Sequence, residues 1–257
     1  MEKLKLNYLH NNSVAQVILN SPKGNVLDSI MMTELLNVLN DFKSNSGLKS
    51  ITFEGEGDHF SFGASVEEHR KENAAAMLEQ FHSLFYAMID LGVPSISKIS
   101  GQCLGGGLEL ALISNLLFAD KTAKLGQPEI VLGVFPPPAS LILPMKIGNS
   151  RAEEILLTGK IISADEGKTI GLINDVFESK DEMNGKVDEY IQKYFLPRSA
   201  SSLRYAVKAS RTMFNHILEN KLKVLENMYT RELMNTEDAN EGINSFLEKR
   251  KPEWKNN

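Results

Sequence analysis

The sequence predicts an α/β fold in which a largely parallel sheet with crossover helices is followed by a mostly helical C-terminal region. In the first half of the chain, short β-branched apolar runs alternate with longer segments whose apolar residues recur at helical spacing. From residue 198 to residue 248 the helical spacing continues without a strand pattern. We therefore expect residues 1–195 to form the sheet-containing core and residues 196–257 a helical region, with no flexible linker between them.

The first predicted unit is a strand, a helix and a second strand. Ser13–Leu19 is rich in β-branched residues and predicts a strand, which the turn-forming segment Ser21–Asn25 ends. Asp28 or Ser29 can cap the helix that follows. The apolar stripe of this helix comprises Met31, Leu35, Leu36, Leu39 and Phe42. A strand at Lys49–Glu54 then completes a crossover unit, so the two strands should be parallel.

The second predicted unit begins with a long helix, which Gly92 and Pro94 end. The apolar residues of this helix are Met77, Leu78, Phe81, Leu84, Phe85, Met88 and Ile89. A strand at Ser95–Ile99, a glycine-rich stretch and a helix over about residues 108–115 follow. That last helix is apolar nearly all round, which predicts that it is buried. Another strand begins at Leu116.

Two shorter helices are predicted in the second half. Ser150–Glu153 has the pattern of a capping box that opens a helix ending at Gly159. Ala164–Ile170 predicts a further helix, closed by Gly171.

Composition and charge narrow the range of possible functions. The net charge is -5 and the pI is about 5.6, which argues against nucleic acid as a main partner, because phosphate binding needs a basic surface. Cys103 is the only cysteine, so no disulfide forms within the chain and an oxidising compartment is not implied. No secretory signal or membrane-spanning apolar run is visible. We therefore expect a cytoplasmic protein with no membrane partner.

Two carboxylates stand out because each follows glycine or proline. Glu109 ends the run Gly105–Glu109, and Glu129 ends Gly126–Glu129. A site that adds water or shuttles a proton needs one carboxylate to accept a proton and another to hold or return one. The positive end of the helix dipole alone would stabilise the carboxylate of Glu109. A carboxylate on a buried helix, however, also needs a partner or a functional role.

Two glycine turns at strand-to-helix junctions could supply backbone donors. The turns are Gly105–Gly107 and Phe62–Ser65. Glycine lets the backbone approach a ligand closely, although glycines at such junctions also serve close packing alone. The spacing is neither that of a dinucleotide-binding turn nor that of a phosphate-binding loop. Two amides directed at one carbonyl oxygen would form an oxyanion hole.

The order of these motifs resembles that of the crotonase (enoyl-CoA hydratase/isomerase) superfamily. It runs through Asn25-Val-Leu, Phe60-Ser-Phe-Gly-Ala, Gly101-x-x-x-Gly-Gly-Gly-x-Glu, Phe118-Ala-Asp and Gly126-Gln-Pro-Glu-Ile-x-Leu-Gly. Ala152-x-Glu-Ile-Leu-Leu-Thr-Gly, Gly171-Leu-Ile-Asn and the terminal Phe246-Leu-Glu-Lys-Arg-Lys-Pro continue it. The resemblance therefore covers nearly the whole chain.

The resemblance implies a crotonase-like β-β-α spiral core, with a C-terminal region that mediates trimer assembly and forms part of the CoA pocket. It implies an acyl-CoA thioester substrate, no separate cofactor, no metal, and a homotrimer or dimer of trimers. The amides of Ala64 and Gly106 match those that hold the thioester oxygen, and Glu109 and Glu129 match the two catalytic glutamates of the hydratases. The positions that match CoA-thioester contacts are Lys23, Val26, Ala64, Ser65, Val66 and Gly106. Because isomerases often retain one carboxylate, both together favour a hydratase.

Three departures from the usual hydratase pattern bear on the substrate. Ser65 and Asn115 each stand where an aspartate is usual. Pro136–Leu141 replaces the usual Pro-Gly-Ala-Gly-Gly-Thr, and three prolines remove amide donors and stiffen the wall, which suits a ring better than a straight acyl chain. Gly63–His69 together with Phe135–Ser140 resembles the cyclohexa-1,5-diene-1-carbonyl-CoA hydratases of anaerobic benzoyl-CoA degradation.

Two other functions remain open from the sequence. One is a generic enoyl-CoA hydratase or isomerase of fatty-acid β-oxidation. The other is a non-catalytic RNA- or CoA-binding protein, which the acidic pI and the two glutamates disfavour. The histidines His59, His69 and His82 lack metal-ligand spacing and predict surface or loop roles, although His69 could contact CoA. Cys103 is expected to be a buried, unreactive thiol.

Overall fold

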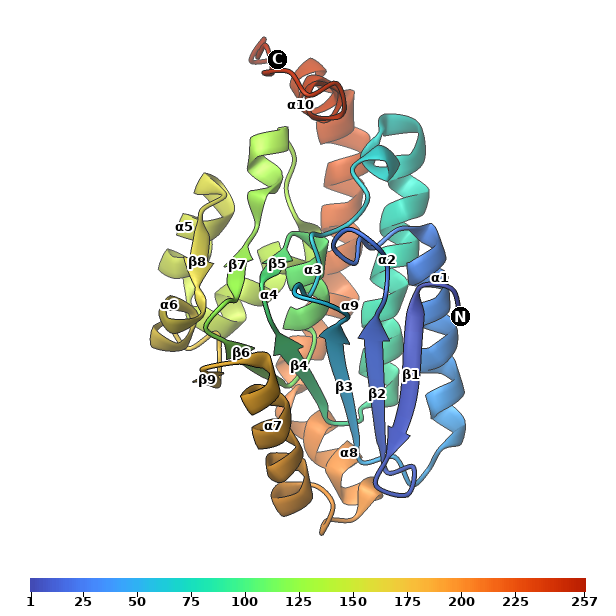
Figure 1. The fold of residues 1–257 in the computed structure, drawn as a ribbon. Coiled ribbons are helices and arrows are strands. Elements are labelled where there is room, and N and C mark those ends of the chain that lie inside the picture. Colours follow the sequence, from blue (N-terminus) through green and yellow to red (C-terminus); the bar gives the residue numbers. More distant parts are fainter.

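A six-stranded sheet forms the centre of the fold (Figure 1). The computed structural model describes residues 1–257. The sheet order is β1-β2-β3-β4-β6-β9, with β1 antiparallel to β2 and every other neighbouring pair parallel. Its strands are β1 (Leu4–Leu9), β2 (Val14–Leu19), β3 (Ser50–Gly55), β4 (Ser95–Ile99), β6 (Leu116–Asp120) and β9 (Asp175–Phe177). The predicted parallel α/β sheet is confirmed.

A smaller, three-stranded sheet lies beside the large one and was not predicted. It consists of β5 (Gln102–Leu104), β7 (Lys124–Gly126) and β8 (Ile161–Ser163), in the order β5-β7-β8. Each strand has only three residues, too few to show the alternation by which a strand is recognised in a sequence. The sheet joins the glycine-rich stretch after β4 to the segment that carries Glu129.

The helices cover both faces of the large sheet. They are α1 (Ser29–Asp41), α2 (Lys71–Leu91), α3 (Gly106–Leu112), α4 (Pro137–Ile147), α5 (Asn149–Thr158), α6 (Ala164–Thr169), α7 (Lys180–Tyr194), α8 (Ala200–Ser210), α9 (Thr212–Asn227) and α10 (Glu237–Leu247). Single 3-10 turns lie at Phe42–Ser44, Glu67–His69, Pro128–Leu132 and Leu233–Asn235, and a π-helical turn at Met228–Glu232. The C-terminal region is mostly helical, as predicted, and its last residues, 251–257, form neither helix nor strand.

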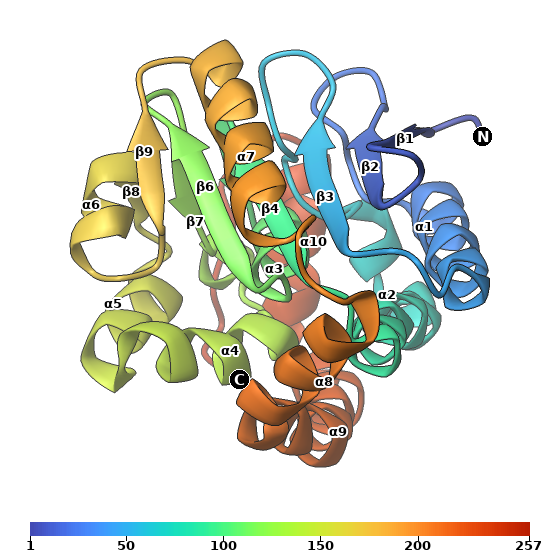
Figure 2. The same cartoon turned by 90° about the horizontal axis from the view of Figure 1, so that it is seen from below.

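The two faces of the sheet have cores of very different size. Figure 2 shows α7 alone across one face, with α1, α2, α3, α4 and α9 gathered on the other. The face under α7 carries a cluster of six buried hydrophobic residues, among them Ile96 and Phe118 of the sheet and Val187 of α7. The other face carries a continuous core of 51 buried residues. The larger core therefore lies between the sheet and the helices that surround α3, as burial of that helix requires.

The helix ends show where local sequence determined structure and where it did not. Asp28 caps α1 by accepting a hydrogen bond from the Met31 amide, and Gly92 ends α2 in the left-handed conformation, both as predicted. The helix expected over residues 108–115 spans Gly106–Leu112. The capping box at Ser150 is wrong: Gly148 occupies the cap position with no side-chain hydrogen bond, and Ser150 lies inside α5 and is exposed.

The C-terminal region is anchored to α3. The guanidinium of Arg211, at the start of α9, donates to the carbonyl oxygens of Ile113 and Ser114 at 2.5 and 2.7 Å. A cation at the carboxyl end of a helix satisfies the free carbonyls and opposes the negative end of the dipole. Arg211 therefore holds the end of the helix whose amino end carries Gly106.

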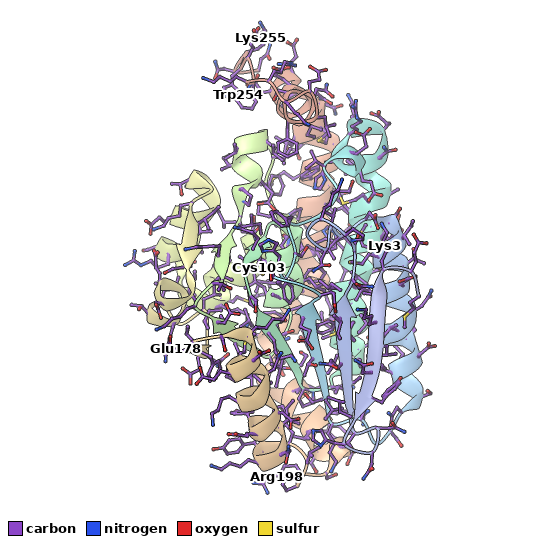
Figure 3. All side chains as sticks on the ribbon, viewed as in Figure 1. Lys3, Cys103, Glu178, Arg198, Trp254 and Lys255 are labelled. Atoms are coloured by element: carbon purple, nitrogen blue, oxygen red, sulfur yellow. The ribbon has the colours of Figure 1, made fainter.

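The last residues lie against the segment between β7 and α4. Figure 3 shows Trp254 and Lys255 at the end of the molecule occupied by α10. A Cβ atom added at Gly133 or Gly242 would lie 3.3 or 3.0 Å from the Trp254 ring, so the tail packs closely on both glycines. No helix is both long and apolar enough to span a bilayer.

Candidate active site

The site is a cavity of about 340 Å³ that brings the two glycine turns, α3 and the C-terminal region together. Twelve of its 21 lining residues are hydrophobic. They are Phe62, Gly63, Ala64, Val66, His69, Met77, Leu78, Phe81, Leu104, Gly105, Gly106, Glu109, Pro128, Glu129, Val131, Leu132, Phe135, Pro136, Pro137, Tyr229 and Phe246. An apolar cavity with a few converging polar groups is the usual form of a small-molecule site.

The amides of Ala64 and Gly106 belong to backbone turns that touch. A Cβ atom added at Gly106 would lie 3.1 Å from the nitrogen of Ala64. Hydrogen bonds from Leu27 N to Gly63 O (2.9 Å) and from Ser65 N to Leu27 O (3.1 Å) fix the turn on both sides of Ala64. Neither the Ala64 nor the Gly106 amide donates to any acceptor in the protein. The two turns therefore present a pair of free donors at one place in the cavity.

Glycine is required at the turn before α3. Gly105 has φ +50°, in the region that favours glycine, and a Cβ there would lie 2.7 Å from Oε1 of Glu129. A Cβ at Gly107 would lie 2.6 Å from that of Ser61. The glycines thus let the backbone approach both the carboxylate of Glu129 and the neighbouring segment at Ser61.

Glu109 lies on α3, one helical turn after its start, and only 4% of it is exposed. Its Oε1 accepts a hydrogen bond of 2.9 Å from the amide of Ala139. Burial raises the pKa of Glu109 well above its usual range and the charge of Glu129 raises it further, while the Ala139 hydrogen bond opposes both. Glu109 is therefore stabilised in its protonated form.

Glu129 lies in the 3-10 turn Pro128–Leu132. With the buried side-chain amide of Gln127 oriented so that its nitrogen faces the carboxylate, Gln127 donates to both oxygens at 3.0 and 3.1 Å. Burial raises the pKa of Glu129 to about 8. Because Glu109 and Glu129 interact and both pKa values are raised, the pair retains a proton at neutral pH. Such a pair can serve as acid and base in one reaction.

The other predicted CoA contacts divide into those at the cavity and those away from it. Val66 lines the cavity with Ala64 and Gly106, but Ser65 and Val26 do not. Lys23 lies in a separate polar hollow formed by Asn20–Asn25 and Glu56–His59. Phe62 stands between the two, since a Cβ at Gly24 would overlap its ring while Phe62 itself lines the cavity.

The histidines differ from one another. His69 lines the cavity and its Nδ1 lies 2.7 Å from the carbonyl oxygen of Ser65, while burial lowers its pKa, so the ring is neutral with Nε2 free to accept. His82 is not at the surface or in a loop as predicted: it is buried in α2, 3.1 Å from a carboxylate oxygen of Glu226. No group of three or more His, Cys, Asp or Glu side chains is arranged to hold a metal.

Cys103 is buried, as predicted, and burial raises the pKa of its thiol. Figure 3 shows it near the middle of the molecule.

Some cavity residues were expected from the sequence and others were not. Phe135 and the first two prolines of Pro136–Leu141 form one part of the wall, in the segment for which the sequence predicts a stiff wall, and Tyr229 and Phe246 reach the cavity from the C-terminal region. Gln127 belongs to a recognised motif, but its contact with Glu129 was not anticipated. Tyr229 is far from the glycine turns in the sequence and carries no local motif. Phe246 begins a terminal motif, but only the tertiary fold reveals that both side chains line this cavity.

Comparisons with known proteins agree with this geometry. A family model described as enoyl-CoA hydratase/isomerase matches residues 10–257. The chain is 43% identical over 245 residues to a cyclohexa-1,5-dienecarbonyl-CoA hydratase of Thauera aromatica, covering 95% of this chain and 93% of that protein. It is 34% identical to a probable enoyl-CoA hydratase of Bacillus subtilis, covering 94% of this chain and 95% of that protein.

The fold is also that of solved structures. A crystal structure of an enoyl-CoA hydratase from Mycobacterium avium subsp. paratuberculosis superimposes with a TM-score of 0.86, at 22% identity, over 99% of each chain. At that identity the likeness shows a shared fold, which includes the helical C-terminal region.

Proposed function

Because the chain belongs to the enoyl-CoA hydratase/isomerase family and is a hydro-lyase, we propose that it hydrates a cyclic dienoyl-CoA thioester. The proposed reaction converts cyclohexa-1,5-diene-1-carbonyl-CoA to 6-hydroxycyclohex-1-ene-1-carbonyl-CoA, a step in anaerobic aromatic degradation. The observation that carries the proposal is one apolar cavity that holds two free amides and a carboxylate pair with raised pKa values.

The proposed mechanism uses each polar group once. The amides of Ala64 and Gly106 donate to the thioester oxygen and stabilise the negative charge that develops there. The ionised carboxylate of the pair takes a proton from water, and the hydroxyl oxygen bonds to the β-carbon. The electron pair of the double bond moves into the dienolate, and the protonated carboxyl returns a proton to the ring carbon farther along the diene. Substrate and water are both consumed, and the carboxylate pair ends with one proton, as it began.

A ring is proposed as the acyl group because of the wall beside the carboxylates. Pro136 and Pro137 lie there with Phe135, and the prolines have fixed backbone angles and no amide hydrogen. Such a wall offers a flat, stiff, apolar surface. The similarity to the Thauera aromatica protein supports the same acyl group.

The test is a panel of acyl-CoA esters, with the gain of one water measured by mass. We expect the cyclic dienoyl thioester to be hydrated with a larger kcat/KM than crotonyl-CoA. A preference for crotonyl-CoA would instead establish a generic enoyl-CoA hydratase, the function named for the Bacillus subtilis relative. RNA retardation without hydration of any ester would support a binding protein.

We also propose that the C-terminal region assembles the chain into trimers. Tyr205 of α8 and Met213 and Val224 of α9 are exposed apolar side chains on that region. Sedimentation velocity of the full chain tests the proposal, and a monomer at micromolar concentration would contradict it.

A further inference from the structure

The part of the cavity beside the carboxylates lacks backbone donors. Pro136 precedes α4, and Pro137 and Pro138 are its first two residues, so three successive positions have no amide hydrogen. The first amide of that helix, on Ala139, donates to Glu109. The free amides that a helix start can offer to a ligand are therefore missing here or already used.

Tyr229 brings a hydroxyl to this part of the cavity. Its side chain lines the cavity and is only 1% exposed, yet its Oη has no hydrogen-bond partner in the protein. Buried hydroxyl groups are normally paired, because an unpaired one costs about 1–3 kcal/mol. An unpaired phenol in a cavity therefore points to a hydrogen-bond acceptor that is present only in the complex.

The surroundings of Tyr229 hold the ring in place and keep the phenol protonated. It lies in the π-helical turn Met228–Glu232, a kind of helix distortion that is frequent at functional sites. Its ring packs edge-on against Phe135, with centroids 5.4 Å apart. Burial raises its pKa, and the charges of Glu129 and Glu109, which line the same cavity, raise it further. The hydroxyl therefore keeps its proton and can donate a hydrogen bond.

We propose that Tyr229 is a third catalytic residue, whose hydroxyl donates a hydrogen bond to the oxygen of the water that Glu109 and Glu129 activate. This inference rests on the proposed hydratase function. One lone pair of the water oxygen accepts from Tyr229 and the other attacks the β-carbon. One O–H bond of the water breaks as its proton passes to the ionised carboxylate. Tyr229 keeps its own proton, so it adds no step to the proton balance.

The test is Tyr229→Phe, which retains the ring and its contact with Phe135 and removes only the hydroxyl. We expect kcat for hydration to fall about 10- to 100-fold, the effect of one hydrogen bond at a reacting centre. The dissociation constant of the matching saturated acyl-CoA, measured by calorimetry, should stay within about threefold, because that ester uses the amides and the apolar wall but no water. Tyr8→Phe makes the same chemical change on an exposed side chain of β1 and serves as the control.

Two results would overturn the assignment. One is a kcat within about twofold of the unaltered enzyme, since the hydroxyl would then have no role in turnover. The other is a loss of affinity of Tyr229→Phe for the saturated ester by the same factor as the loss in kcat, because Tyr229 would then only shape the cavity. The assay uses whichever ester of the panel the unaltered enzyme hydrates best. If the enzyme hydrates a linear ester best, the ring substrate is refuted, but the effect of Tyr229→Phe can still be measured with that linear ester.

Discussion

In one region of the cavity the polar groups are backbone amides, whereas in the other they are side chains. The amides of Ala64 and Gly106 come from two glycine turns, each held by backbone hydrogen bonds or by a helix start. The second region contains Glu109, Glu129 and Tyr229, and there prolines have removed the amides. The two amides of the first region can only donate, and the second region combines two acids with one hydroxyl.

This difference separates two tasks. Stabilising charge on a thioester oxygen needs donors at a constant position, and backbone amides supply them without a titratable group. Moving a proton needs groups whose pKa values lie near the working pH, which only side chains provide. The first region should therefore be insensitive to pH and the second sensitive to it.

The largest expected effect is at the carboxylates. Glu109→Gln and Glu129→Gln each keep the shape of the side chain and remove its proton transfer. We expect each to lower kcat for hydration by about 10²–10⁴-fold while binding of the saturated acyl-CoA changes little. Glu153→Gln, at an exposed position of α5, is the matched control and should leave kcat unchanged. Near-normal turnover in either site variant would remove that glutamate from the chemistry.

The next effect tests the amide region alone. The added methyl of Gly106→Ala would lie 3.1 Å from both the nitrogen and the Cβ of Ala64, and so crowd the two donors. We expect kcat/KM to fall about 10²–10³-fold, the usual result of losing one oxyanion donor. Gly185→Ala is a matched control, because nothing lies within 4 Å of the added methyl in α7. It should keep full activity and gain about 0.5–1 kcal/mol of stability. Equal activity in the two variants would mean that the amides do not hold the oxygen.

The smallest expected effect is a pH dependence of the free energy of unfolding that comes from the carboxylate region and not from the amide region. Burial raises the pKa of Glu129 from 4.5 to about 8, so the folded state binds its proton more tightly than the unfolded state does. That contribution to the free energy of unfolding is complete below pH 4.5 and is lost as the pH rises to about 8. The stability of the unaltered chain relative to Glu129→Gln should therefore fall between these pH values, as measured by urea unfolding. The stability difference between the unaltered chain and Gly106→Ala, which keeps both glutamates, should show no such trend, and a trend of equal slope in that difference would contradict the assignment.

The sequence predicted the amide region more fully than the side-chain region. Strands β2, β3, β4 and β6 and helices α1 and α2 follow from periodicity and end signals such as Asp28 and Gly92, because those signals are local. The glycine turns and both glutamates could be predicted for the same reason, because they lie in contiguous motifs. The capping box at Ser150 failed because Gly148, with φ +75°, ends one helix and begins the next, which leaves Ser150 inside α5.

What remained hidden depends on contacts between distant segments. Strands β5, β7 and β8 have three residues each and form only because they pair with one another. Tyr229 is 100 positions from Glu129 and enters the cavity through a π-helical turn, which no residue type announces. Lys23 matches a motif, yet it lies in a neighbouring hollow, because Phe62 stands between that hollow and the cavity.

The two free amides also affect how this cavity can change under mutation and selection. A backbone N–H is present whatever side chain its residue carries, so a substitution can remove it only by introducing proline or by moving the chain. The proline and tyrosine wall is encoded residue by residue, and a single codon change alters its shape or its hydroxyl. New acyl groups can therefore be accommodated by changes around Phe135 and Tyr229 while the thioester end of the site is inherited intact.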